Sequence, residues 1–126
     1  MTKNDASVLL VAKPSRMRDG LRAFLRTIPY LRIVGQAEDG PSAQVLVSEQ
    51  RPALVLLGAN LPNDEVQTVL AQTKAACPET RCIVLVDSSQ RQWLAEIAGA
   101  DSVLLTGFPP AKFVSTIEEL LSLETI

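Results

Sequence analysis

The chain has 126 residues, 12 of them basic and 14 acidic, with no histidine. A net charge of -2 predicts no basic stripe and disfavours direct binding of nucleic acid by this domain. The length suits a single domain, spanning 1–126 with its core at about 7–122. Hydrophobic residues make up 47% of the chain, which argues against disorder. No apolar run approaches the length of a membrane span or a signal peptide, so we expect a cytoplasmic protein.

Cys77 and Cys82 are the only cysteines. Without histidine they do not form a set of soft ligands for zinc or haem. The simplest interpretation is two reduced thiols packed in or near the core. We therefore expect no metal site and no cofactor.

Five short segments have the pattern of β-strands. Residues 7–12 (SVLLVA) and 53–58 (ALVLLG) are continuous apolar runs, as expected of strands covered on both faces. Residues 82–86 (CIVLV) repeat the pattern and residues 103–105 give a shorter version. Residues 32–37 (RIVGQA) are more mixed, which favours an edge strand.

Helical patterns lie between these strands. Shorter ones at 41–50 and 90–98 predict a second and a fourth helix, the latter followed by Gly99 as its cap. Pro109 and Pro110 are placed where fixed φ angles help to start the last helix. The three clearest apolar stripes are Met17, Leu21, Phe24, Leu25 and Ile28; Val66, Val69, Leu70, Thr73 and Cys77; and Phe113, Ile117, Leu120 and Leu121.

The elements therefore alternate as five β-α pairs. Right-handed crossovers turn this order into an open parallel sheet with helices on both faces. We predict an α/β fold, a doubly wound (βα)5 three-layer sandwich whose five strands lie in the order 2-1-3-4-5. In such a sheet ligands and catalysis are found at the carboxyl ends of the strands.

Several segments resemble a known family. They are VLLVAKPSRMRDGLRAFL, RPALVLLGANLP, ETRCIVLV, AGADSVLL and the FPPAKF stretch. Together these look like successive parts of a CheY-like receiver domain of the response-regulator family. The resemblance covers roughly residues 7–121. It is closest, at RDGLRAFL and at the VLL-x-x-x-LP pattern, to receivers that precede a helix-turn-helix output domain.

The resemblance implies a phosphorylation site that this chain lacks. The family needs two acidic residues after the first strand to hold Mg²⁺ and an aspartate after the third to accept the phosphoryl group. It also uses a threonine or serine after the fourth strand and a lysine after the fifth. Those positions here are Ala12, Lys13, Gly58, Val86 and Thr106. We therefore predict a degenerate receiver that is not an enzyme.

Polar residues near these positions do not replace the missing groups. Asp87, Ser88 and Ser89 follow the fourth strand, while Asp64 and Glu65 follow the third. None stands where the acceptor belongs, and in-line transfer requires close placement of the oxygen. We expect these side chains to be solvated.

Lys13 places an ammonium where the family keeps a divalent cation. We expect an ion pair with Asp87 across the emptied pocket. The alternative is a lysine that extends into solvent, since exposed pairs add only about 0 to 1 kcal/mol.

The family commonly docks partners on the surface made by the fourth helix, the fifth strand and the fifth helix. Trp93 suits an interface because indoles are enriched at binding hot spots, but a tryptophan at helical spacing with Leu94 and Ile97 is more often simply packed. Val103 occupies the position on the fifth strand where the family has an aromatic side chain that swings inward on phosphorylation. The candidate interface residues are Trp93, Val103, Phe108, Lys112 and Glu119.

Two functions follow as hypotheses. The first is a phosphorylation-independent interaction module in two-component signalling or transcription control, bound to a protein partner or to a second copy. The second is a sensor whose small ligand occupies the pocket vacated at Gly58, near Ala12, Val86 and Thr106. Fold alone implies no catalytic activity.

Overall fold

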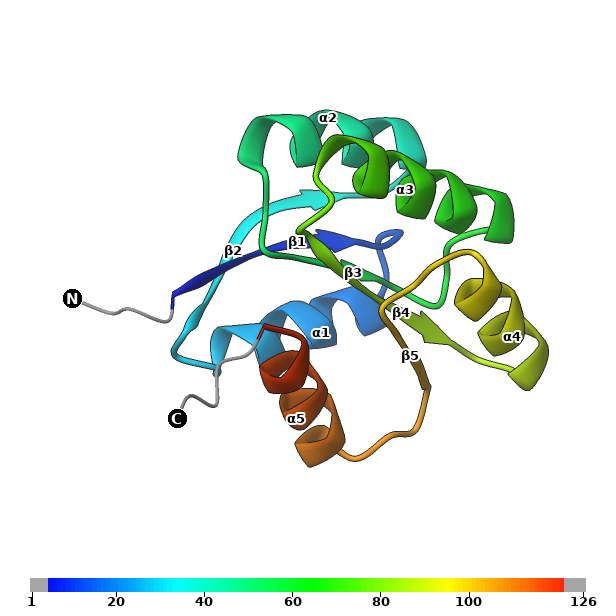
Figure 1. Cartoon of the computed structure of the whole chain (residues 1–126). Helices are drawn as coiled ribbons and strands as arrows, with labels where there is room; N and C mark the ends of the chain where they lie inside the picture. The colour runs from blue at the N-terminus through cyan, green and yellow to red at the C-terminus, as the bar shows by residue number, and fades with distance from the viewer. Residues whose placement is uncertain (1–4, 122–126) are drawn as a thin grey trace.

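Residues 5–121 of the computed structural model form three layers around a parallel sheet. Helices α1 and α5 cover one face, while α2, α3 and α4 cover the other (Figure 1). The strands lie in the order β2-β1-β3-β4-β5, as the sequence predicts. The strands are β1 (Ala6–Val11), β2 (Leu31–Ala37), β3 (Leu54–Leu57), β4 (Arg81–Val86) and β5 (Ser102–Leu105).

Three of the helices, α1, α2 and α4, begin at polar caps that the sequence supplies locally. Ser15 accepts a hydrogen bond from the Arg18 amide at 3.1 Å, and Asp39 accepts one from the Ser42 amide at 2.9 Å. Gly99 follows α4 with a φ of +102°, which confirms its predicted role in ending that helix. The helices are α1 (Arg16–Arg26), α2 (Gly40–Gln50), α3 (Asn63–Ala76), α4 (Ser89–Ile97) and α5 (Pro110–Leu121).

The core has one apolar cluster on each face of the sheet. Alternate residues of β1 divide between them: Leu9 and Val11 face α2 and α3, whereas Val8 and Leu10 face α1 and α5. Burial on both faces explains why the central strands are continuous apolar runs. Both cysteines are buried and unpaired, as expected.

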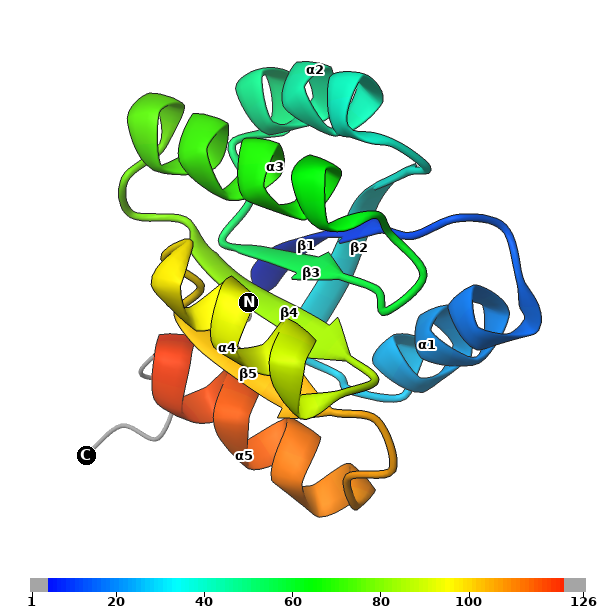
Figure 2. The same cartoon turned by 90° about the vertical axis from the view of Figure 1, so that its right-hand side faces the viewer.

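The two lateral edges of the sheet are β2 and β5 (Figure 2). The ladder between β1 and β2 shifts register at Val34, because Val8 pairs with Ile33 but Leu9 pairs with Gly35. Most of β2 is only half-buried. The mixed composition of this segment therefore did indicate an edge strand.

Within residues 5–121, no helix is both long enough and apolar enough to cross a membrane.

Candidate functional site

The carboxyl ends of β1, β3, β4 and β5 bring the five predicted site positions to one edge of the sheet. Ala12 and Gly58 directly follow β1 and β3, and the Gly58 amide donates a hydrogen bond to the Val11 carbonyl at 2.8 Å. The Thr106 amide likewise donates to the Val86 carbonyl at 2.8 Å. The Ala12 and Val86 side chains are buried, whereas Thr106 is exposed. None of these side chains carries a carboxylate.

The space at Gly58 is filled. A Cβ atom built on Gly58 would lie 2.9 Å from the Cβ of Ala12 and 3.1 Å from the Cε of Met17. Contacts this short require the neighbouring atoms to move. The apolar stripe of α1 predicted Met17 only as a residue packed on the sheet. In the structure its methyl group also reaches the position where the family's acceptor would begin.

The predicted ion pair between Lys13 and Asp87 is wrong. The Lys13 ammonium donates a hydrogen bond to the Glu38 carbonyl at 3.1 Å and lies 3.8 Å from Glu65 Oε1. Asp87 Oδ1 instead lies 3.9 Å from Nη1 of Arg91, four residues later in the chain. Lys13 and Asp87 therefore each interact with a partner on their own side of the site, and no ion pair joins the two residues.

Asn60 ties two loops together at this edge. Its side-chain oxygen accepts from the Lys13 amide at 3.1 Å, while its nitrogen donates to the Lys13 carbonyl at 3.1 Å and to Ser15 Oγ at 3.2 Å. The loop after β1 is therefore fixed to the loop after β3. The sequence contains no signal for this role, because a loop asparagine usually serves only its own turn.

Arg91 makes a second link, from α4 to the loop after β3. Its guanidinium donates to Asn63 Oδ1 at 3.0 Å, to the Ala59 carbonyl at 3.3 Å and to the Leu61 carbonyl. A planar guanidinium has enough donors to bind all three acceptors at once. The start of α4 is thus held against the β3–α3 loop. Sequence reasoning missed Arg91 because its partners lie about thirty residues away.

The other polar residues near the site have ordinary surroundings. Ser88 is the N-cap of α4 and accepts from the Arg91 amide at 3.2 Å. Asp64, Asp87 and Ser89 are exposed, and Glu65 contacts only Lys13 among charged partners. Among residues 5–121, no three His, Cys, Asp or Glu side chains are grouped so as to hold a metal ion.

The hollow beside Val86 is too small for the ligand that the sequence allowed. A cavity of about 10 Å³ lies there between Val86, Arg91 and Leu94. Small-molecule sites usually enclose about 300 to 1,000 Å³. Met17 occupies the space at Gly58 on the other side. The expectation of a vacated ligand pocket is therefore wrong: the site is packed like the core.

The candidate interface residues differ in how far their side chains are exposed. Trp93 is 60% exposed and Ile97, one turn later on α4, is 63% exposed; Leu105 at the end of β5 is 41% exposed. Trp93 is therefore on the surface and is not packed in the core. Lys112 and Glu119 are exposed on α5.

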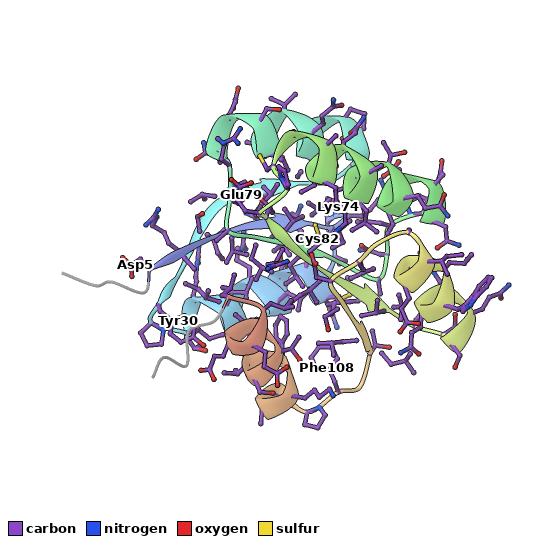
Figure 3. The ribbon with its side chains drawn as sticks, viewed as in Figure 1. Asp5, Tyr30, Lys74, Glu79, Cys82 and Phe108 are labelled. Atoms are coloured by element: carbon purple, nitrogen blue, oxygen red, sulfur yellow. The ribbon has the colours of Figure 1, made fainter. Side chains whose placement is uncertain are left out.

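Val103 and Phe108 also take part in packing. Val103 packs against the apolar cluster that α4 helps to cover. The Phe108 ring lies beside α5 (Figure 3), with its centroid 5.4 Å from that of Phe113, and belongs to the cluster shared with α1. Both side chains are only partly buried, so their predicted place in a docking surface stays a prediction.

Comparison with known proteins agrees with this architecture. No family model matches the chain. The transcriptional regulatory protein YhcZ of Bacillus subtilis is 30% identical over 102 residues, which cover 79% of this chain and 48% of that protein. The chain spans about half the length of the curated relatives it matches.

Solved structures give the same result. The signal receiver domain of NarL from Mycobacterium tuberculosis superposes with a TM-score of 0.82 at 21% identity, covering 94% of this chain and 98% of that one. A LuxR-family two-component response regulator from Aurantimonas has a TM-score of 0.78 at 25% identity, over 94% and 86% of the two chains. The chain therefore has the CheY-like fold of response-regulator receiver domains. Its sequence relatives include the nitrate/nitrite response regulator protein NarL of Escherichia coli.

Proposed function

We propose that this receiver-type domain works without phosphorylation, as a protein interaction module in the control of transcription. The observation that carries the proposal is the packing at Gly58. A receiver accepts its phosphoryl group on a carboxylate at this position, whereas here Ala12 and Met17 occupy the space that such a side chain would need.

The charges around the site support the same conclusion. Mg²⁺ is held by oxygen ligands, mainly carboxylates. Ala12 offers none, and Lys13 brings a positive charge whose nearest acidic partner is Glu65 at 3.8 Å. Repulsion between the ammonium and a divalent cation adds to the lack of ligands. Without a metal or an acceptor, the domain has no route to phosphoryl transfer and acts by binding.

The surface formed by α4, β5 and α5 is the proposed docking site, for a second copy of the chain or for another signalling protein. Trp93, Ile97 and Leu105 are exposed apolar side chains on α4 and β5. Exposed aromatic and aliphatic groups of this kind are characteristic anchors of protein interfaces. Arg91 holds α4 against the β3–α3 loop, so this surface is kept in one arrangement without a covalent signal.

The test is incubation of the full chain with Mg²⁺ and acetyl phosphate, followed by intact mass and light scattering. We expect no added phosphoryl group and no change in oligomeric state. A receiver domain that keeps its acceptor aspartate, treated in parallel, shows that the reagent is active. A stable phosphoryl adduct on this chain would overturn the proposal and direct mutagenesis to Asp64, Asp87 and the neighbouring serines.

A further inference from the structure

Helix α1 carries a basic stripe. Arg18, Arg22 and Arg26 are spaced four residues apart, which places them along one side of the helix. Residues 14–37 contain five arginines and one aspartate, a local charge of +4 in a chain whose total is -2. The sequence-based expectation of no basic stripe was wrong, because the net charge averages this excess against acidic residues elsewhere.

The stripe borders a groove at the free edge of the sheet. A cavity of about 360 Å³ lies between α1 and β2. Its walls are the side chains of Arg22 and Arg26 and the β2 residues Leu31 and Ile33 to Gln36. Within the described residues, β2 pairs with β1 alone, so its outer edge presents backbone N–H and carbonyl groups that face no strand.

Most of the groove's lining is polar, but its floor includes three apolar side chains that are only partly covered. Leu31, Ile33 and Val34 are all partly exposed, although their side chains are of the kind that normally packs. The register shift at Val34 interrupts the ladder with β1, which bends the strand locally. The groove therefore combines an unpaired strand edge, apolar side chains and two arginines.

We propose that this groove binds an acidic segment of a partner protein in an extended conformation. The segment would lie along β2, with its carboxylates at Arg22 and Arg26 and its apolar side chains over Ile33 and Val34. The proposal goes beyond the function proposed above. It uses the opposite lateral edge of the sheet from β5, so either can fail without the other.

The two arginines are available for this contact. Arg22 lies 3.6 Å from Asp19, whose side chain is 62% exposed, so this surface pair is weak and easily exchanged. Arg26 makes no ion pair with any residue among 5–121 and is exposed in the last turn of α1. Both can therefore turn to a carboxylate of the partner.

A peptide fits this groove better than a nucleic acid does. A phosphate backbone would offer neither apolar side chains to Leu31, Ile33 and Val34 nor peptide groups to the free edge of β2. A strand of alternating acidic and apolar residues satisfies the arginines, the floor and the strand edge together. We expect the bulge at Val34 to keep the ladder between β2 and the bound segment short. Binding then depends chiefly on charge, and the affinity falls as the salt concentration rises.

The experiment measures fluorescence anisotropy of a labelled, monomeric peptide of alternating glutamate and valine against the full chain. We expect saturable binding that weakens with salt and no comparable binding of a lysine-valine peptide or of a DNA duplex. Arg22→Glu with Arg26→Glu should lower the affinity about tenfold or more. Arg16→Glu with Arg51→Glu makes the same change in net charge outside the groove and should cost less than about threefold.

Two further measurements keep the result decisive. If the glutamate variants melt early, Arg22→Gln with Arg26→Gln replaces them and should still weaken binding. Methylating alternate backbone nitrogens of the peptide keeps its charges but removes its edge hydrogen bonds, and should weaken binding severalfold. No binding of the acidic peptide, equal losses in the two double variants, no effect of N-methylation, or stronger binding of DNA through Arg22 and Arg26 would each overturn the proposal.

Discussion

The carboxyl edge of the sheet and its lateral edges differ in how their surfaces are used. At the carboxyl edge, where receivers carry their chemistry, Gly58, Ala12 and Met17 are in close contact. At the lateral edges, Trp93, Ile97 and Leu105 are exposed near β5, and the groove beside β2 is half covered. The carboxyl edge at Gly58 is thus closed by apolar packing, whereas apolar side chains remain accessible toward both lateral edges.

Filling the space at Gly58 avoids the loss of stability that an empty cavity there would cause. Replacing large buried side chains with small ones leaves a cavity unless the neighbours collapse into it. Here the flexible Met17 side chain supplies the atoms, which is a role that methionine fills well. The packing therefore both stabilises the domain and prevents entry of a ligand.

The strongest test of this comparison is Gly58→Asp. The new side chain would displace Ala12 or Met17 and would bury a carboxylate without a metal, so we expect a loss of about 3 kcal/mol in the free energy of unfolding. Urea denaturation measures it. Gly20→Asp is the control, because a Cβ at Gly20 meets no atom within 4 Å. A stable Gly58→Asp variant that takes up phosphate from acetyl phosphate would contradict the closed site.

The second test concerns the exposed edge. Trp93→Ala with Ile97→Ser should change unfolding by less than about 1 kcal/mol, because both side chains are largely in solvent. We expect the dimer dissociation constant, measured by analytical ultracentrifugation, to rise about tenfold or more. Val45→Ser on α2 removes a side chain of similar exposure, 54%, and should have no effect. A parent chain that stays monomeric would leave another protein as the partner.

The third test concerns the Tyr30 phenol, which is partly buried at the amino end of the strands, and we expect the smallest change in stability there. Burial, and then the hydrogen bond that Tyr30 donates to Glu118 at 3.0 Å, raise the pKa of the Tyr30 phenol to about 12. The neutral phenol thus contributes stability below pH 10, and this contribution is lost as the pH rises from about 10 to about 12.

Glu118→Gln should lower this pKa while leaving it above 10, since burial is the larger cause. Phenolate absorbance in the near ultraviolet follows the titration, with exposed Glu119→Gln as the control. An unchanged titration midpoint in Glu118→Gln would show that the Glu118 hydrogen bond has no part in the shift.

The fold could be predicted because its signals are local. Continuous apolar runs, helical stripes and a cap such as Gly99 depend on neighbouring residues, and the predicted strands differ from the observed ones by no more than one position at either end. The positions of Ala12 and Gly58 at the carboxyl edge followed from the same alternation of elements.

The contacts within the site could not be predicted in the same way. The partners of Lys13, Asn60 and Arg91 depend on where long side chains run between loops that are distant in sequence. The contact of Phe108 with Phe113 could not be predicted either: the sequence shows an aromatic residue just before α5 but not which side of the sheet its ring faces.

The link made by Asn60 has a consequence for the conditions under which the domain keeps its shape. A carboxamide has no proton to gain or lose in the physiological range, and its three hydrogen bonds to Lys13 and Ser15 involve no ion. The two loops it joins are therefore held alike in acidic or neutral, dilute or saline surroundings. No metal ion takes part in these three hydrogen bonds, so we expect a chelator to leave the contact between the two loops unchanged.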